Sequence, residues 1–189
     1  MQQEEALIAR ICHDLITPFN AINLGIETYE ESKDISLLED IKTSVEKANS
    51  LLKFMRELYS IKYEVFFYSV ISLNKLISDL LKNYNIKCDL ESDIENISRT
   101  IGKIVMYNAI IAREIMPFGG NVVAKINNTS KEITTICSGN KLLEIDINAS
   151  NEPDHKNIIR HNLAKFLEKI GAQATITKQE SNVIILERL

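Results

Sequence analysis

Apolar residues recur along the first 62 residues at steps of three and four, which is the spacing of one face of an α-helix. The first run is Ile8, Cys12, Leu15, Phe19, Ile22 and Ile26, and the second is Leu38, Ile41, Val45, Ala48, Leu52, Met55 and Tyr59. Between them lies the polar stretch ETYEESKDIS, in which Ser36 and Glu39 fit a capping box at the start of a second helix. The pattern therefore predicts an antiparallel helical hairpin.

The apolar stripe on each helix of this hairpin is wider than one partner helix can cover. The extra positions are Leu7, Ile11, Leu51, Phe54 and Leu58. Two hairpins packed side by side would bury the surplus in a four-helix bundle. We therefore expect residues 1–63 to form a helical dimerisation domain in a homodimer.

The pattern changes near residue 64, where segments of strand-like alternation are separated by segments of helical spacing. The expected strands span 65–70, 86–91, 122–126, 132–137, 174–178 and 183–188, and the expected helices span 72–84, 99–116 and 155–170. Residues 142–147, LLEIDI, also alternate and could form one more short strand. Residues 64–189 are thus predicted to form an α/β sandwich of one sheet under helices, in a chain of the α+β class.

Charge and hydropathy exclude two classes of partner. The 22 Lys and Arg residues against 26 Asp and Glu give a net charge of −4, and no basic cluster offers a surface for nucleic acid. No apolar run approaches the roughly 18 residues of a membrane-spanning helix, and the acidic start MQQEEALIAR is unlike a secretory signal. We expect a cytoplasmic protein that binds neither nucleic acid nor membrane.

The cysteines and the later histidines give no sign of a metal site or a disulfide framework. Cys12, Cys88 and Cys137 are far apart, lie among apolar neighbours and form no CxxC pair, which favours buried, reduced thiols. His155 and His161 are six residues apart, so they do not share one helical face, and we interpret them as surface residues. No metal is expected.

His13 lies on a different stripe of the first helix from the apolar seam. Arg10, His13, Thr17 and Asn20 follow one another at steps of three and four, so His13 should point outward. Taken alone, an exposed His-Asp pair is an ordinary surface feature. Pro18, however, lies inside the helix, where it removes a backbone hydrogen bond at a cost of about 3 kcal/mol. Such a residue beside an exposed histidine is easier to explain by function than by fold.

The stretch HDLITPFNAI, residues 13–22, resembles the H-box of the dimeric phosphotransfer domains of bacterial sensor histidine kinases, H-[ED]-x-x-[TN]-P. The resemblance implies that His13 is a phosphoacceptor and that Asp14 orients or deprotonates it. It also implies that Thr17 governs attack on the aspartyl phosphate. An imidazole nitrogen suits this chemistry because it is a good nucleophile near neutral pH.

The second domain resembles the ATP-binding domain of the same kinases but departs from it where ATP would bind. MYNAIIAREIMPFGGNV is similar to an N-box, with Asn108 in the magnesium-binding position, although Asn108 also falls on an apolar stripe and could equally be a buried structural residue. Cys137 stands where a carboxylate should read adenine, and no G-x-G occurs in the chain. A phosphate-holding loop needs glycines for its backbone. We expect a degenerate domain that binds no ATP and no cofactor of its own.

A complete H-box joined to a degenerate nucleotide site resembles the ChpT-type histidine phosphotransferases. The resemblance implies a homodimer that moves phosphoryl groups from the receiver domain of a CckA-like hybrid kinase to CtrA-like and CpdR-like response regulators. The magnesium would belong to the receiver domain. Arg10 and Asn20 would be exposed contacts for these partners, or else part of an ordinary solvated face. Two alternatives remain: an ATP-dependent sensor-type histidine kinase, and a noncatalytic dimeric adaptor that binds receivers.

Overall fold

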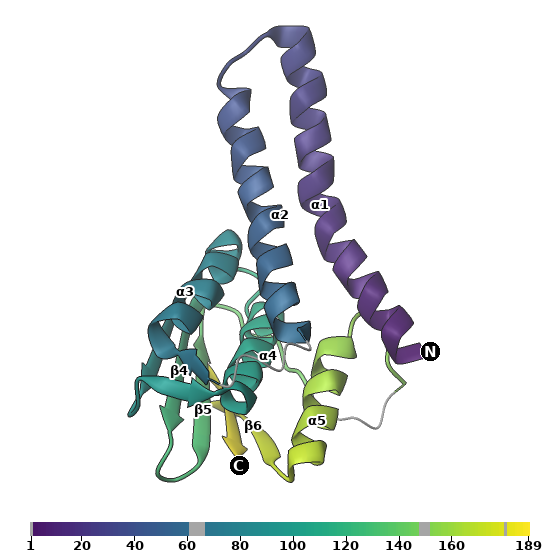
Figure 1. Cartoon of the computed structure of the whole chain (residues 1–189). Helices are drawn as coiled ribbons and strands as arrows, with labels where there is room; N and C mark the ends of the chain where they lie inside the picture. Colours follow the sequence, from purple (N-terminus) through teal and green to yellow (C-terminus); the bar gives the residue numbers. More distant parts are fainter. Residues whose placement is uncertain (1, 61–66, 148–151, 180) are drawn as a thin grey trace.

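The fold is described by a computed structural model over residues 2–60, 67–147, 152–179 and 181–189. The predicted boundary between the two domains, at residues 63 and 64, lies outside the described residues. Figure 1 shows a long helical hairpin whose lower part stands against an α/β unit, with α5 beside the N-terminal end of α1.

The hairpin has the two helices that the sequence predicts, α1 at Gln2–Ser32 and α2 at Leu37–Tyr59. The predicted capping box at Ser36 is wrong, since Ser36 has helical backbone angles and makes no side-chain cap. Asp34 orders the turn instead, because its carboxylate accepts hydrogen bonds from the backbone amide and the hydroxyl of Ser36. An aspartate two residues earlier thus satisfies a donor that the chain exposes as it enters α2.

The second unit is a five-stranded sheet in the order β2-β4-β5-β7-β6. Its strands are β2 Ile86–Ser92, β4 Gly120–Asn127, β5 Glu132–Ser138, β6 Gln173–Gln179 and β7 Asn182–Arg188. The pair β2 and β4 is parallel, and the other neighbours are antiparallel. The helices α3 (Val70–Leu81), α4 (Arg99–Ile115) and α5 (Ile158–Ile170) lie on one side of it, as Figure 1 shows. The predicted α+β class is confirmed.

Two details of the sheet differ from the sequence prediction. A small second sheet pairs β1 (Phe67–Ser69) with β3 (Asn96–Ser98), and β3 was not predicted because three residues give too short a pattern. Residues 142–147 do not form the possible extra strand. Their alternation has another cause: Leu142, Ile145 and Ile147 pack against the core from an irregular segment.

The hairpin and the α/β unit share one apolar core. Leu51, Phe54 and Leu58 of α2 are buried in the same cluster as Ile104 and Ile110 of α4. These α2 positions are part of the surplus stripe from which the sequence predicts a four-helix bundle. That reasoning is wrong for them, because the chain covers them with its own second unit. An apolar stripe in the sequence indicates that its side chains are buried, but it does not identify the segment that covers them.

Part of the apolar seam that the sequence predicts along the hairpin remains uncovered. The exposed apolar side chains there include Ile8, Phe19, Ile26, Leu38, Val45 and Leu52. Several large apolar side chains on one helical hairpin are more than a monomeric surface usually carries, and such patches mark interaction sites.

A carboxyl group is buried inside the α/β unit. Glu187 of β7 is 0% exposed, and it lies beside Asn108 of α4, whose amide donates a hydrogen bond to the Thr135 hydroxyl at 2.9 Å. Burial raises the pKa of Glu187 from its ordinary value of 4.5 to about 7, although Asn108 favours the charged form. Between about pH 4.5 and pH 7, the carboxyl group of Glu187 therefore keeps its proton in the folded protein and loses it in the unfolded chain.

This proton makes stability depend on pH. The contribution of Glu187 is fully present below about pH 4.5 and is lost as pH rises to about 7, because only the unfolded chain ionises freely in that range. Glu187→Gln keeps a neutral polar side chain, so it should flatten the pH dependence and stabilise the protein at pH 8. Urea unfolding of both proteins from pH 5 to pH 8 tests this. A difference between them that is the same at every pH would contradict the assignment.

Candidate functional site

His13 projects from the middle of α1 into solvent, as its stripe on the helix predicts. Its side chain is 69% exposed. One ring nitrogen, Nδ1, lies 3.3 Å from Oδ1 of Asp14. A carboxylate only accepts hydrogen bonds, so a neutral imidazole that donates to it carries its proton on Nδ1 and keeps the lone pair on Nε2. The geometry thus presents a nucleophilic nitrogen on an accessible imidazole.

Asp14, in contrast, is turned into the protein, with a side chain that is 7% exposed. Its Oδ2 atom is 3.1 Å from Nε of Arg10 and 2.7 Å from Nη2 of Arg113. Burial by itself disfavours the charged carboxylate. The guanidinium groups of Arg113 and Arg10 outweigh this effect, and the pKa of Asp14 lies below its ordinary value of 3.8. Asp14 is therefore ionised at neutral pH and is a weak base.

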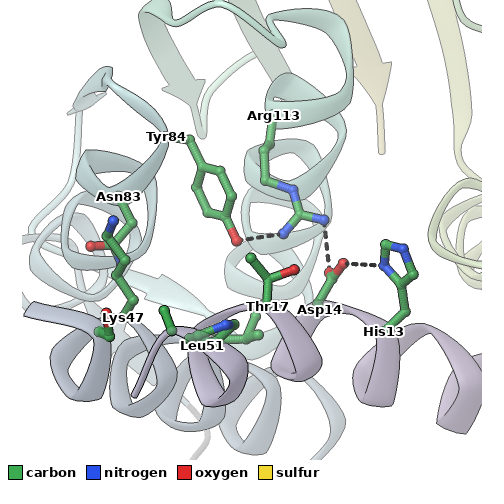
Figure 2. A pocket seen from close by; sticks show the side chains of 11 residues that line it. His13, Asp14, Thr17, Lys47, Leu51, Asn83, Tyr84 and Arg113 are labelled. Atoms are coloured by element: carbon green, nitrogen blue, oxygen red, sulfur yellow. Dashed lines mark hydrogen bonds and ion pairs between the residues drawn. The ribbon is translucent and has the colours of Figure 1, made fainter. Parts of the chain in front are cut away.

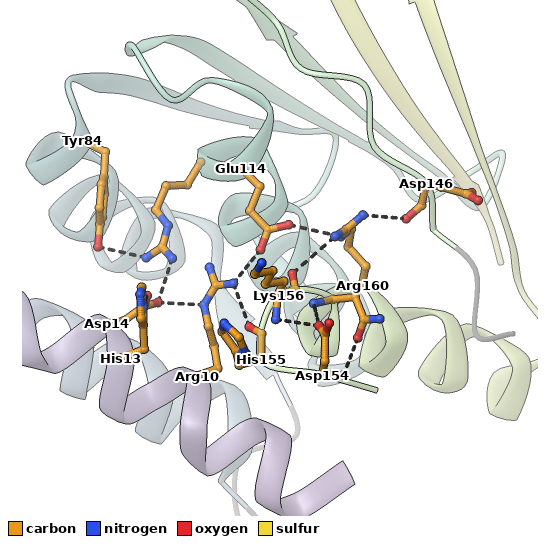
Figure 3. A network of polar contacts seen from close by, with 12 residues as sticks. Arg10, His13, Asp14, Tyr84, Glu114, Asp146, Asp154, His155, Lys156 and Arg160 are labelled. Atoms are coloured by element: carbon orange, nitrogen blue, oxygen red, sulfur yellow. Dashed lines mark hydrogen bonds and ion pairs between the residues drawn. The ribbon is translucent and has the colours of Figure 1, made fainter. Parts of the chain in front are cut away.

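Arg10 is not exposed, so the prediction of an exposed contact residue is wrong on this point. It is 8% exposed and forms ion pairs with Asp14 and with Glu114 of α4 at 3.1 Å. It also donates a hydrogen bond to the backbone carbonyl of His155 at 3.2 Å. The turn that precedes α5 and the last turn of α4 both approach α1 near Arg10, and the His155 carbonyl and the Glu114 carboxylate hold its guanidinium inside (Figure 3).

Thr17 and Asn20 lie one and two turns beyond His13 and are exposed, as predicted. Thr17 lines a cavity of about 330 Å³ beside His13, between the hairpin and the α/β unit. The other residues around it are His13, Asp14, Pro18, Ala21, Ser44, Lys47, Leu51, Asn83, Tyr84 and Arg113. Figure 2 shows that α1, α2, α4 and the short turn at Lys82–Tyr84 each contribute to this wall. A partner side chain has room to enter next to the imidazole.

Arg113 and Tyr84 belong to the site although the sequence pattern did not identify them. Arg113 donates a hydrogen bond to the Tyr84 hydroxyl at 2.9 Å, and its guanidinium carbon is 4.7 Å from the centre of the Tyr84 ring. Residue 113 is 99 positions from Asp14 along the chain. An arginine in the last turn of a predicted helix has an ordinary role there, which is to interact with the helix dipole. No local signal marks it as a partner of the H-box.

The polar network continues from Asp14 away from the cavity. Glu114 pairs with Arg10 and, through its other carboxylate oxygen, with Nε of Arg160 at 3.2 Å. The His155 ring is exposed and its centre lies 6.1 Å from that of His13 (Figure 3). The prediction of a surface position is confirmed for His155 and is wrong for His161, which is 7% exposed on the inner face of α5.

Asn108 and Cys137 are the two positions at which resemblance to a kinase would put nucleotide contacts. Both side chains are buried. Asn108 is 1% exposed and Cys137 is 0% exposed. Asn108 is thus the buried structural residue that the sequence left as one alternative. In the described ranges, no cluster of three or more His, Cys, Asp or Glu side chains could hold a metal ion.

The three cysteines are free, but they differ in burial. Cys137 is buried as predicted, and burial raises the pKa of its thiol to about 12. Cys88 is half-buried, with a thiol pKa that is also raised to about 12 by burial and by Asp89. Cys12 is exposed in the single chain, so the prediction of a buried thiol does not hold there. It lies on the uncovered seam of α1.

In the part of the chain that the structure describes, no helix combines the length and the apolar character needed to cross a membrane.

Comparison of the sequence with known proteins finds similarity to phosphotransferases. Residues 72–149 match the family model for the histidine phosphotransferase C-terminal domain. The chain is 45% identical over 51 residues to the protein phosphotransferase ChpT of Brucella abortus (strain 2308). That stretch covers 26% of this chain and 24% of the relative, so the match spans about a quarter of the relative's length.

The fold is similar to that of a solved bacterial phosphotransferase, with a TM-score of 0.85 at 18% identity, over 98% of this chain and 95% of the other. It is also similar to the histidine kinase ThkA in complex with the response regulator protein TrrA, with a TM-score of 0.53 at 17% identity. That match covers 95% of this chain and 59% of the ThkA chain. At these identities the likeness establishes a shared, histidine-kinase-like fold.

Pro18 tests the link between the helix and the site. α1 continues through Pro18, which has no amide to donate to the Asp14 carbonyl. Pro18→Ala supplies that amide and should raise the free energy of unfolding by up to about 3 kcal/mol. If His13 is a phosphoacceptor, transfer should slow, because the restored amide would bond the Asp14 carbonyl and alter the backbone next to His13. Thermal unfolding and transfer rates measure both effects, with Glu27→Ala, at an exposed position further along the same helix, as a control. A less stable variant with an unchanged transfer rate would contradict this role of Pro18.

Proposed function

We propose, from the premise that the chain is a ChpT-type protein with a histidine phosphotransferase C-terminal domain, that it carries phosphoryl groups between receiver domains on His13. The observation that carries the proposal is the exposed imidazole of His13, held through Nδ1 by the buried carboxylate of Asp14. This arrangement leaves Nε2 available to a docked partner.

The proposed reaction is a direct exchange between nitrogen and oxygen. Nε2 of His13 attacks the phosphorus of an aspartyl phosphate on the donor receiver, an N–P bond forms, and the receiver carboxylate leaves with the electrons of the broken O–P bond. Positive charge develops on the imidazole as it attacks. Asp14 offsets this charge as a neighbouring carboxylate, and its lowered pKa argues that it orients His13 and does not remove the proton. The reverse reaction charges an acceptor receiver.

Two features support transfer between proteins over an ATP-dependent kinase. Asn108 and Cys137 are covered by the core, and the chain has no G-x-G with which to hold phosphates. A nucleotide would have to displace well-packed side chains to reach either position. We therefore propose that the protein binds no ATP and that the magnesium required for transfer is the receiver's own.

The proposed partners are receiver domains, and resemblance to the ChpT type suggests those of a CckA-like hybrid kinase and of CtrA-like and CpdR-like response regulators. The likeness in fold to a kinase that has been solved with a response regulator is in keeping with this. Thr17 lines the cavity beside His13, and Asn20 is exposed on the same side of α1. We propose that both contact a docked receiver. Such partners would place the protein in the cytoplasm.

The uncovered seam of the hairpin supports a homodimer. Its exposed residues, among them Phe19, Leu38 and Leu52, follow the same helical spacing on α1 and α2. A second hairpin would cover them in a four-helix bundle, and each Å² of apolar surface removed from water contributes about 25 cal/mol. Cys12 would then be shielded as well.

A labelling experiment separates the proposed function from its alternatives. We expect a receiver domain charged with labelled acetyl phosphate to transfer its label to the wild-type protein as acid-labile phosphate. His13→Ala should abolish this transfer while thermal stability changes little, because substitutions at exposed helix positions usually matter by less than about 0.5 kcal/mol. Labelled ATP should give no protein phosphate.

The alternatives predict different labels. Direct labelling by ATP would favour the sensor-type kinase, and binding of receivers without any labelling would favour the noncatalytic adaptor. Transfer to His13→Ala would contradict the assignment of the phosphoacceptor.

The dimer is tested by placing a charge on the seam. Leu52 is exposed in the single chain, so Leu52→Glu should leave the fold of each subunit intact and yet split the dimer by burying a carboxylate in the bundle. Ile71→Glu is the matched control, because Ile71 is exposed on α3, away from the hairpin. Light scattering at micromolar concentration should show a monomer for Leu52→Glu alone. A monomeric wild-type protein would remove the basis for the bundle.

A further inference from the structure

We infer that Arg113, from the second domain, is a positioning residue that orients His13 through Asp14, so that the phosphoacceptor site is built jointly by the hairpin and the α/β unit. The inference rests on the proposed function for its consequence, and on the polar contacts of Arg113 for its evidence.

Arg113 is fixed from more than one direction. Nη2 lies 2.7 Å from Oδ2 of Asp14, and the two side chains are 11% and 7% exposed. Nη1 donates a hydrogen bond to the Tyr84 hydroxyl at 2.9 Å, and the guanidinium lies over the Tyr84 ring. An arginine held by a carboxylate, a hydroxyl and an aromatic face loses little freedom when it acts, because its planar group is already in place. Figure 2 shows Arg113 between Tyr84 and Asp14.

The contacts of Arg113 decide which carboxylate oxygen faces the imidazole. Oδ2 of Asp14 accepts hydrogen bonds from the guanidinium groups of both Arg113 and Arg10. Oδ1 therefore remains as the oxygen that faces Nδ1 of His13. Arg10 belongs to the same helix as Asp14 and approaches it from one turn earlier. Arg113 comes from α4 and fixes the carboxylate from outside that helix. Removing it frees the carboxylate to rotate and leaves Oδ1 without a fixed direction toward His13.

The charges at this junction lead to the same conclusion. Arg10, Arg113 and Arg160 contribute three positive charges, and Asp14 and Glu114 contribute two negative charges. Without Arg113, Asp14 would stay buried with one cation fewer, and its ionised form would be less favoured. The Nδ1–H tautomer of His13, which an ionised acceptor favours, would lose its main support.

The apolar core, and not Arg113, holds the hairpin against the second domain. Leu51, Phe54 and Leu58 already bury α2 against α4. Attachment of the hairpin to the second domain therefore does not depend on Arg113. Its substitution can change the imidazole while the domains stay together.

The test compares Arg113→Gln with Arg160→Gln in the full chain. Both variants remove a guanidinium from the same junction, but Arg160 pairs with Glu114 and has no contact with Asp14 among the interactions described. Arg113→Gln should slow phosphoryl acceptance from a receiver charged with acetyl phosphate by about tenfold or more, since loss of alignment is costly in transfer reactions. Receiver affinity should stay within about twofold. Arg160→Gln should transfer at close to the wild-type rate.

A second readout does not depend on any receiver. Nitrogen-15 NMR of the His13 ring reports which nitrogen carries the proton. We expect mostly the Nδ1–H tautomer in the wild-type protein and in Arg160→Gln, and a mixture in Arg113→Gln. Arg113→Lys should restore part of the tautomer preference and part of the rate, and it covers the case in which Arg113→Gln does not fold.

The outcomes separate this inference from the proposed function. An unchanged tautomer and an unchanged rate in Arg113→Gln would overturn it, and so would equal losses in Arg113→Gln and Arg160→Gln. If no receiver labels the wild-type protein, the proposed function fails, and the tautomer measurement still decides whether Arg113 positions His13.

Discussion

The buried carboxylate of Asp14 is the constraint on which the arrangement of this protein depends. A charged group cannot leave water without partners of opposite charge, and Asp14 has two, Arg10 from its own helix and Arg113 from the second domain. The same carboxylate faces the exposed His13. Satisfying one buried charge therefore brings together side chains of the hairpin and of the α/β unit, which the apolar core already holds against each other, and orients the imidazole that faces solvent.

In the second domain, the positions at which resemblance to a kinase would put nucleotide contacts are buried. Asn108 bonds to Thr135, Glu187 is buried beside it, and Cys137 lies in the apolar core. These side chains fill the contact between α4 and the sheet. A rigid α4 is what the junction with α1 requires, since Arg113 and Glu114 reach the hairpin from the last turn of that helix.

The hairpin uses its apolar residues on two sides. One set, including Leu51, Phe54 and Leu58, packs into the core shared with α4. The other set, including Phe19 and Leu52, stays exposed in the single chain and suits a second copy. His13 belongs to neither apolar set. It lies on a different stripe of α1 and is exposed. This position leaves the imidazole of His13 accessible from solvent.

The sequence by itself determined the main helices and strands and the exposure of His13. Helical spacing predicted α1 and α2, alternation predicted β2, β4, β5, β6 and β7, and the stripe of His13 predicted its exposure, because these properties depend on neighbours within a few residues. Only the tertiary structure decided what surrounds that residue. It buried Arg10, brought Arg113 to Asp14 across 99 positions, and covered Leu51 with the chain's own second domain. The periodicity of a segment indicates which side chains are buried and which are exposed. The residues that contact each side chain depend on how distant segments pack together.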